Sequence, residues 1–194
     1  MAQDEQAHPW ETPPELWRGL RSSKADWRGR VVSIFIAPKA AAEMVSVAQV
    51  RAVTDRGLEG DRFFRDSWSA LNRPDKAVTF IEEETLDIAA TELGVESLAQ
   101  KSRRNIVTRG APLVELLHRE FTVGSVRLRG IRLFEPCGHL VRISGLRGIY
   151  EALEHRSGLK AAVLSDGPIG VGDPIALKNE TQPASIVLRQ NSRR

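Results

Sequence analysis

The chain has 194 residues, of which 41% are hydrophobic and 27% charged, and its formal net charge is +3. This length and composition suit one globular domain with tails, and they exclude a disordered or fibrous chain. The 25 acidic residues balance most of the 28 basic ones, so the net charge does not by itself predict nucleic-acid binding.

The single cysteine excludes an internal disulfide and a four-cysteine zinc site, and it favours a reducing, cytoplasmic setting. No stretch approaches the roughly 18 apolar residues that a membrane-spanning helix needs. The first thirty residues also lack the apolar segment of a signal peptide. We therefore expect a cytoplasmic protein that makes no contact with a membrane.

Residues 1–29 are polar, contain several prolines and show no periodic pattern, so they are expected to form an extended N-terminal arm. The arm carries Trp10, Trp17 and Trp27, large apolar groups that should pack on the folded domain or on a second subunit. Residues 179–194 are polar and are expected to form a C-terminal tail. The folded domain is therefore predicted to span residues 30–178.

Within this domain, runs rich in β-branched and aromatic residues predict short strands. In chain order these runs lie at 30–37, 46–53, 77–81, 105–108, 121–134, 159–164 and 169–177. Apolar residues at helical spacing predict three brief helices, at 82–93, 112–120 and about 146–156. Gly94 is expected to end the first helix, and the glutamates of its first turn suit the positive helix N-terminus.

Many short strands and glycine-marked turns with few helices indicate a mainly β protein, α+β by content. The predicted architecture is a β-barrel whose openings or edges are covered by the short helices. A doubly wound sheet would need strands and helices that alternate throughout the chain, and that alternation is absent.

The lone thiol, Cys137, directly follows a predicted strand and lies between Glu135 and His139. A free cysteine is more often a small buried hydrophobic residue than a reactive group, because reactivity needs access and a stabilised thiolate. A Cys–His hydrolase is disfavoured, since catalytic Cys and His are usually distant in sequence. His139 is therefore expected at most to tune the thiol.

Basic residues gather in two segments, and each group is either a solvated face or a site for an anion. The first group is Lys101, Arg103, Arg104 and Arg109, and the second, around the cysteine, is Arg127, Arg129, Arg132, Arg142 and Arg147.

Six segments, in this order, make the chain resemble the MOSC domain, named for the C-terminal domain of molybdenum cofactor sulfurase. They are GLEGDR (57–62), RRNIV (103–107), FTVG (121–124), EPC (135–137), GLKAAV (158–163) and VGDPI (171–175). The resemblance runs from about Val31 to Leu177. It implies a closed, mostly β barrel, similar to the pyruvate-kinase barrel, of the short single-domain bacterial type. It also implies a site for the molybdenum cofactor, a pterin that holds the metal through a dithiolene and ends in a phosphate.

Relatives either bind this cofactor and reduce N-hydroxylated or N-oxide substrates, or have been proposed to carry sulfur as a cysteine persulfide. Both activities make Cys137 central, as a metal ligand and catalytic residue or as the sulfur carrier. A thiolate suits both, because it is a soft metal ligand and the nucleophile that accepts sulfur. A non-catalytic module that binds anions or RNA is a third alternative, and pyridoxal phosphate binding is not expected.

The resemblance carries the cofactor contacts onto Arg62, Arg103 and Asn105. The guanidinium groups of the two arginines could bind a phosphate in planar, bidentate fashion. Arg104 is the alternative to Arg103, because neighbours on a strand point to opposite faces. Lys39 follows the first strand at about the position of a lysine in the reductase relatives. His139 is included as a neighbour of the site.

Two departures from the reductase relatives bear on these expectations. Those relatives often have a second cysteine at the position of Leu140, so Cys137 is the only thiol available here. We also expect the additional N-terminal barrel of those relatives, and any attached ferredoxin or haem module, to be absent here. We therefore expect a small-molecule substrate, a monomer or homodimer, and a separate electron-transfer protein as partner, or a cysteine desulfurase if sulfur is carried.

Overall fold

The computed structural model describes residues 27–64 and 78–178. Most of the predicted arm, with Trp10 and Trp17, and the whole tail at 179–194 lie outside the described residues. Trp27 is described; it is partly buried against the main core, and its indole Nε1 donates to Glu115 Oε2 at 2.9 Å. In the described part of the chain, no helix has the length and apolar character to cross a membrane.

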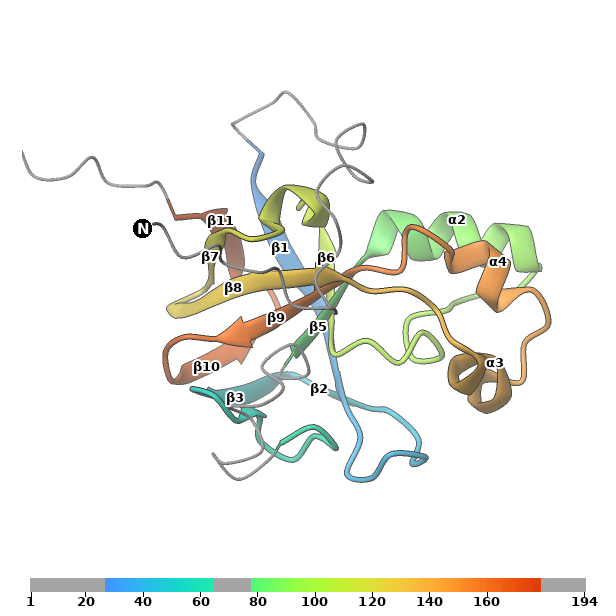
Figure 1. Ribbon diagram of the computed structural model, residues 1–194, viewed down its shortest axis with the longest axis horizontal. Coiled ribbons are helices and arrows are strands. Elements are labelled where there is room, and N and C mark those ends of the chain that lie inside the picture. The colour runs from blue at the N-terminus through green and yellow to red at the C-terminus, as the bar shows by residue number, and fades with distance from the viewer. Residues whose placement is uncertain (1–26, 65–77, 179–194) are drawn as a thin grey trace, which may run out of the picture.

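Seven strands close into a barrel in the order β11–β7–β8–β9–β5–β6–β1, with β1 pairing back onto β11 (Figure 1). They are β1 (Gly29–Ile36), β5 (Val78–Glu82), β6 (Ile106–Arg109), β7 (Glu120–Val123), β8 (Val126–Leu133), β9 (Leu159–Val163) and β11 (Pro174–Leu177). The β5–β6 pair is parallel and the other barrel pairs are antiparallel. The predicted mainly β barrel is confirmed.

The remaining strands lie beside the barrel. β2 (Val45–Val47) pairs with the end of β1. β3 (Gln49–Val53), β4 (Gly57–Leu58) and β10 (Gly167–Gly170) form a separate three-stranded sheet.

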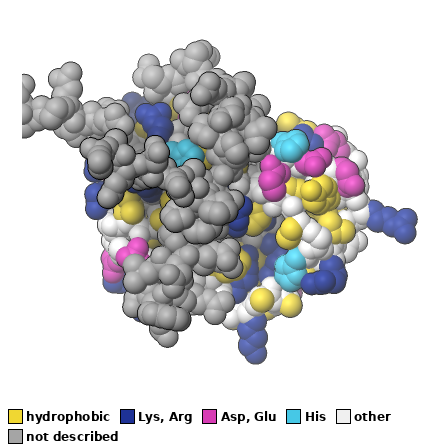
Figure 2. All heavy atoms as spheres, viewed as in Figure 1, with side chains coloured by type: hydrophobic (Ala, Val, Ile, Leu, Met, Phe, Trp, Pro, Cys, Tyr) yellow, Lys and Arg dark blue, Asp and Glu magenta, His cyan; other side chains and the backbone are white. Residues whose placement is uncertain are grey.

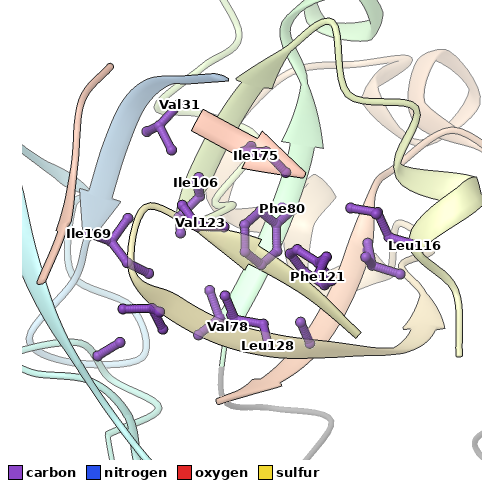
Figure 3. Packing of buried hydrophobic residues seen from close by; sticks show 14 of the residues in the cluster. Val31, Val78, Phe80, Ile106, Leu116, Phe121, Val123, Leu128, Ile169 and Ile175 are labelled. Carbon is purple, nitrogen blue, oxygen red and sulfur yellow. The ribbon is translucent and has the colours of Figure 1, made fainter. Parts of the chain in front are cut away.

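The barrel interior is filled by side chains that alternate along the strands (Figure 3). In β8, Val126 and Leu128 are buried while Arg127 and Arg129 are exposed, the period of two that a strand with one wet face requires. Across the interior, the rings of Phe80 and Phe121 meet edge to face with centroids 5.6 Å apart. Such a pair adds about 1 kcal/mol to the stabilisation from burial.

Three helices gather on one side of the barrel (Figure 1): α2 (Glu83–Leu93), α3 (Gly138–Ser144) and α4 (Ile149–Leu153). They share a second apolar cluster with the outer face of the barrel, which includes Ile81, Leu86, Leu140, Ile149 and Leu153. On the face shown in Figure 2, acidic side chains gather toward α2 and α4.

The structure confirms four predicted elements within about one residue at each end: the strands at 30–37, 77–81 and 159–164 and the helix at 82–93. Gly94 ends α2 in the left-handed conformation with φ of 64°, as expected of a glycine C-cap. The run at 46–53 divides into β2 and β3, which belong to different sheets.

Two helix predictions were wrong in extent, and one helix was missed. The helix predicted at 112–120 is only a 3-10 turn, η3 (Leu113–Leu116), because His118 adopts a left-handed φ of 60° just before β7. The helix predicted at 146–156 shrinks to α4, since the left-handed Gly148 delays its start. α3 was not predicted, because it is short and begins at a glycine.

Candidate functional site

The loop between β8 and α3 presents the lone thiol. Cys137 is exposed and free, and it is the N-cap residue of α3 in an extended conformation. Two contacts fix the loop to the segment between α4 and β9. Phe134 N donates to Gly158 O at 2.7 Å, and the Glu135 carboxylate accepts the backbone N–H of His155 at 2.9 Å. The His155 ring Nδ1 lies 3.3 Å from the same carboxylate.

His139 and Leu140 both lie on α3, but His139 is exposed and Leu140 is buried. The ring Nδ1 of the exposed His139 faces Arg142 Nη2 at 2.9 Å, so its nearest recorded partner is this arginine. Leu140 is 4% exposed and packs inside the helix layer. A cysteine at position 140 would therefore be buried, whereas Cys137 is open to solvent.

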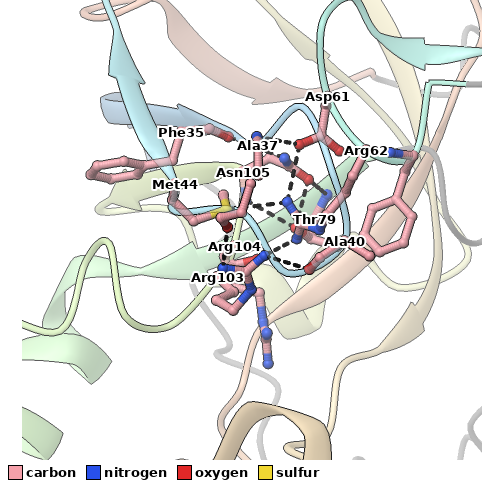
Figure 4. A network of polar contacts seen from close by, with 12 residues as sticks. Phe35, Ala37, Ala40, Met44, Asp61, Arg62, Thr79, Arg103, Arg104 and Asn105 are labelled. Atoms are coloured by element: carbon pink, nitrogen blue, oxygen red, sulfur yellow. Dashed lines mark hydrogen bonds and ion pairs between the residues drawn. The ribbon is translucent and has the colours of Figure 1, made fainter. Parts of the chain in front are cut away.

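Asp61 and Arg62 form a buried ion pair beneath the β1–β2 connection (Figure 4). Arg62 Nη1 donates to Asp61 Oδ1 at 3.0 Å, and the same oxygen accepts the backbone N–H of Ala37 at 3.0 Å. The other terminal nitrogen, Nη2, donates to Arg103 O at 2.9 Å. Burial lowers the pKa of Arg62, while Asp61 acts in the opposite direction.

Arg103 lies in the turn before β6 with a left-handed φ of 60°, a conformation that side-chained residues rarely adopt. Its guanidinium donates to Ala42 O at 2.8 Å and to Ala40 O at 2.9 Å (Figure 4). The side chain therefore fastens the β1–β2 connection to this turn. Burial also lowers the pKa of Arg103, and Asp61 opposes that change.

Arg104 points into the protein and is 2% exposed. Its Nε donates to Ser157 O and its Nη1 to Ser102 O, both at 2.9 Å, and its Nη2 contacts the Ser157 hydroxyl. The guanidinium carbon lies 3.5 Å from the centre of the Phe134 ring, and Lys160 Nζ lies 4.4 Å from the same centre. Burial lowers the pKa of Arg104 to about 9, so the group is still charged at neutral pH.

Asn105 is buried in the network drawn in Figure 4, whereas Lys39 is exposed. The Asn105 side chain is fully buried, where Oδ1 accepts from Thr79 N and Oγ1 and Nδ2 donates to Phe35 O at 3.1 Å. Its amide therefore joins β1 to β5. Lys39 is exposed in the turn after β1. The roles of both residues as cofactor contacts stay predictions.

A hollow of about 300 Å³ opens between the β1–β2 connection, the turn before β6 and the end of α3. Its lining residues are Ala41, Glu43, Met44, Gln100, Lys101, Arg103, Ile143 and Ser144. Arg103 thus lies at one wall of this hollow, and Arg62 holds its carbonyl without lining the hollow itself. Cys137 lies at the opposite end of the seven-residue α3, about 10 Å away along its axis.

Several contributors to the site were not singled out as site residues in the sequence. Asp61 and Met44 hold Arg62, whose Nη1 lies 3.1 Å from the Met44 sulfur. Asp61 could have been found, because it directly precedes Arg62 in the GLEGDR segment. Met44 carries no such signal. Lys101 belongs to a basic cluster that was visible in the sequence, but its place at the hollow was not.

Comparisons with known proteins bear on the family and the fold of the chain. The MOSC domain family model matches residues 59–176, and a search of curated proteins found no match. A solved structure similar to this fold is the YuaD protein of Bacillus subtilis (TM-score 0.63, 16% identity), whose alignment covers 77% of this chain and 97% of that one.

YiiM of Geobacillus stearothermophilus is also similar, with a TM-score of 0.61 and 19% identity over 77% of this chain and 75% of that one. YiiM of Escherichia coli aligns with a TM-score of 0.58 and 18% identity over 79% and 72% of the two chains. At these identities the likeness concerns the fold alone. The family match covers more than half of the sequence, and the chain therefore belongs to the MOSC domain family.

Proposed function

We propose that this MOSC protein binds the molybdenum cofactor, with Cys137 as a metal ligand, and reduces a small N-hydroxylated or N-oxide substrate. The observation that carries the proposal is the arrangement around α3, which has a thiol at its N-cap and a cationic hollow at its other end. The cofactor likewise has two ends that need different partners, a metal held by the dithiolene and a phosphate.

The hollow suits the phosphate end. Two of the five N–H groups of the Arg103 guanidinium bind Ala40 O and Ala42 O, and the other donors remain for a ligand. Lys101 adds a second cation to the lining, while Glu43 is an acidic residue there. A cavity of about 300 Å³ is at the small end of the range for ligand sites. Arg62 supports the site indirectly, by holding the Arg103 carbonyl.

Cys137 suits the metal end. Among the described residues, no group of three or more His, Cys, Asp or Glu side chains could hold a metal ion. A single exposed thiolate is a soft ligand that suits a metal whose other ligands arrive with the cofactor. When bound, the cofactor would supply the redox centre; reduction of an N–OH group to N–H consumes two electrons and two protons and releases water. The electrons would come from a separate electron-transfer protein.

Metal and pterin analysis tests this proposal. The chain would be produced in a host that makes the cofactor and assayed for molybdenum and for pterin fluorescence after oxidation. We expect both in the wild-type protein and a reduced molybdenum content in Cys137→Ala. Wild-type protein that contains neither molybdenum nor pterin would refute the proposed function.

The exposure of Cys137 favours a second candidate function, a sulfur carrier. Its thiolate would attack the outer sulfur of a persulfide on a cysteine desulfurase, form a Cys137 persulfide and release the thiolate of the desulfurase. Incubation with a desulfurase and free cysteine should then add the mass of one sulfur atom to the chain. An equal gain in Cys137→Ala would exclude this role. Both functions suit the cytoplasm, where a lone thiol stays reduced.

A further inference from the structure

A second hollow, separate from the one beside Arg103, opens where η3, the ends of β5 and β8 and the segment between α4 and β9 meet. We call it the Glu82 pocket. Its volume is about 220 Å³, and it shares no lining residue with the hollow beside Arg103. Its wall is largely apolar, and the apolar side chains are Pro112, Leu113, Val114, Leu133 and Phe134. The pocket therefore suits the apolar body of a molecule smaller than a drug-sized ligand.

The charged side chains of the pocket wall leave one negative charge without a partner. Arg156 lines the pocket, but its Nη2 pairs with Glu92 Oε2 at 2.6 Å. The ring of His155, another lining residue, lies 3.3 Å from the Glu135 carboxylate. Glu82 also lines the pocket, and within the described part of the chain no cationic side chain forms an ion pair with it.

Neutral donors hold both carboxylate oxygens of Glu82. Oε1 accepts the backbone N–H of Leu113 at 2.8 Å, and Oε2 accepts the Thr85 hydroxyl at 3.3 Å. A carboxylate accepts about four hydrogen bonds, so acceptor sites remain for a ligand. Burial raises the pKa of Glu82, and the nearby Glu84 acts in the same direction. A partly buried carboxylate without a counter-ion is unfavourable, and a cation in the pocket would offset this cost.

We propose that the Glu82 pocket binds a small organic cation, whose ammonium group pairs with Glu82 and whose apolar body packs on Leu133 and Phe134. This site goes beyond the proposed function and does not depend on it, because other residues form the hollow beside Arg103. That hollow offers a guanidinium group to its ligand, whereas the Glu82 pocket offers a carboxylate.

Binding of benzylamine, a cation at neutral pH, tests the proposal against its neutral counterpart benzyl alcohol. Protein-detected NMR titrations would give a dissociation constant for each compound. We expect wild type to bind benzylamine at least about fivefold more tightly than benzyl alcohol. Glu82→Gln, which keeps an acceptor for Leu113 N, should lose this preference. The matched control is Glu84→Gln, an exposed glutamate of the same helical turn, which should change the preference less than about twofold.

Equal affinity of wild type for the two compounds would overturn the proposal. So would a preference that persists in Glu82→Gln, or one that is lost equally in Glu84→Gln. Val114→Phe tests the location separately and decides the question if Glu82→Gln does not fold. Its larger side chain should fill the pocket and weaken benzylamine binding about tenfold with every charge in place. Undiminished binding in this variant would place the ligand elsewhere and overturn the proposal.

Discussion

The barrel interior and the polar end of the molecule are ordered by different forces. We use "polar end" for the β1–β2 connection, the turn before β6 and the Cys137 loop. In the interior, wholly buried side chains such as Phe80 and Phe121 need only shape and apolar surface. At the polar end, Arg103 and Arg104 are held mainly by backbone carbonyls, and Arg62 by the Asp61 carboxylate and the Arg103 carbonyl.

Mutations in the barrel interior should therefore reduce mainly stability, and mutations at the polar end should reduce mainly function. Burial in the barrel is spread over many contacts, so truncation should reduce stability without touching the chemistry of the polar end. The polar end depends on single hydrogen bonds to specific atoms, so the removal of one partner should disturb its neighbours as well.

Phe121→Ala should cause the largest loss, about 3–5 kcal/mol of unfolding free energy, because a fully buried ring leaves a cavity in the barrel. Urea unfolding followed by circular dichroism measures this loss. Thr122→Ala on the same strand is the control and should change the unfolding free energy by less than about 1 kcal/mol. Equal losses in the two variants would contradict the assignment of Phe121 to the core.

Gly158→Ala should lower the free energy of unfolding by about 3 kcal/mol. Gly158 joins the barrel to the loop behind Cys137. A Cβ at this position would lie 1.8 Å from Phe80 O, and the backbone φ is +101°. Gly172→Ala is the matched control, since φ there is +93° with no neighbouring atom within 4 Å. Thermal unfolding should show a clearly smaller loss for this control. Equal losses would mean that backbone strain alone, not the close approach to β5, governs Gly158.

Asp61→Asn should lower the free energy of unfolding by about 2 kcal/mol, because the carboxylate accepts the N–H groups of Ala37 and Phe63 and pairs with Arg62. An amide can replace one acceptor oxygen but places a donor against the other N–H. The exposed Asp166, which accepts from Thr54, is the control and should lose less on the same change. Urea unfolding of the two variants makes the comparison. A smaller loss at Asp61 than at Asp166 would be inconsistent with a buried ion pair.

Glu82→Gln should have the smallest effect, visible mainly as a change in pH dependence. Burial raises the pKa of Glu82, so the folded state holds this proton more tightly than the unfolded state. Wild-type stability should therefore fall as pH rises from the usual glutamate range through the raised value. The glutamine variant should lose this part of the slope while it keeps an acceptor for Leu113 N. Thermal melts across acidic pH that give parallel slopes would contradict the prediction.

The barrel could be predicted from sequence because its signals are local. In β8, Val126 and Leu128 alternate with Arg127 and Arg129. This pattern predicts one buried and one solvent-exposed face without any knowledge of the partner strands. Pairing order and closure of β1 onto β11 have no such local signal. The resemblance to the MOSC family implied a closed barrel, which the structure confirms, whereas the pairing order comes from the structure alone.

The candidate site could be predicted only in part. Arg62 and Arg103 were named from the family motifs, and the structure brings them into one network. The partners of Arg103 are the carbonyls of Ala40 and Ala42, which any residue type would supply, so no sequence pattern reveals them. The burial of Arg104 against Phe134 likewise depends on a tertiary contact across distant segments.

We propose that the hollow beside Arg103 and the thiol of Cys137 hold the two ends of one cofactor. The most direct test is the molybdenum and pterin content of Lys101→Glu, which reverses a charge in the lining of the hollow, against wild type from the same host. Arg129→Glu, on the exposed face of β8, is the matched charge control. We expect the molybdenum and pterin contents to fall in Lys101→Glu and to persist in wild type and Arg129→Glu. Wild-type contents retained in Lys101→Glu would contradict it.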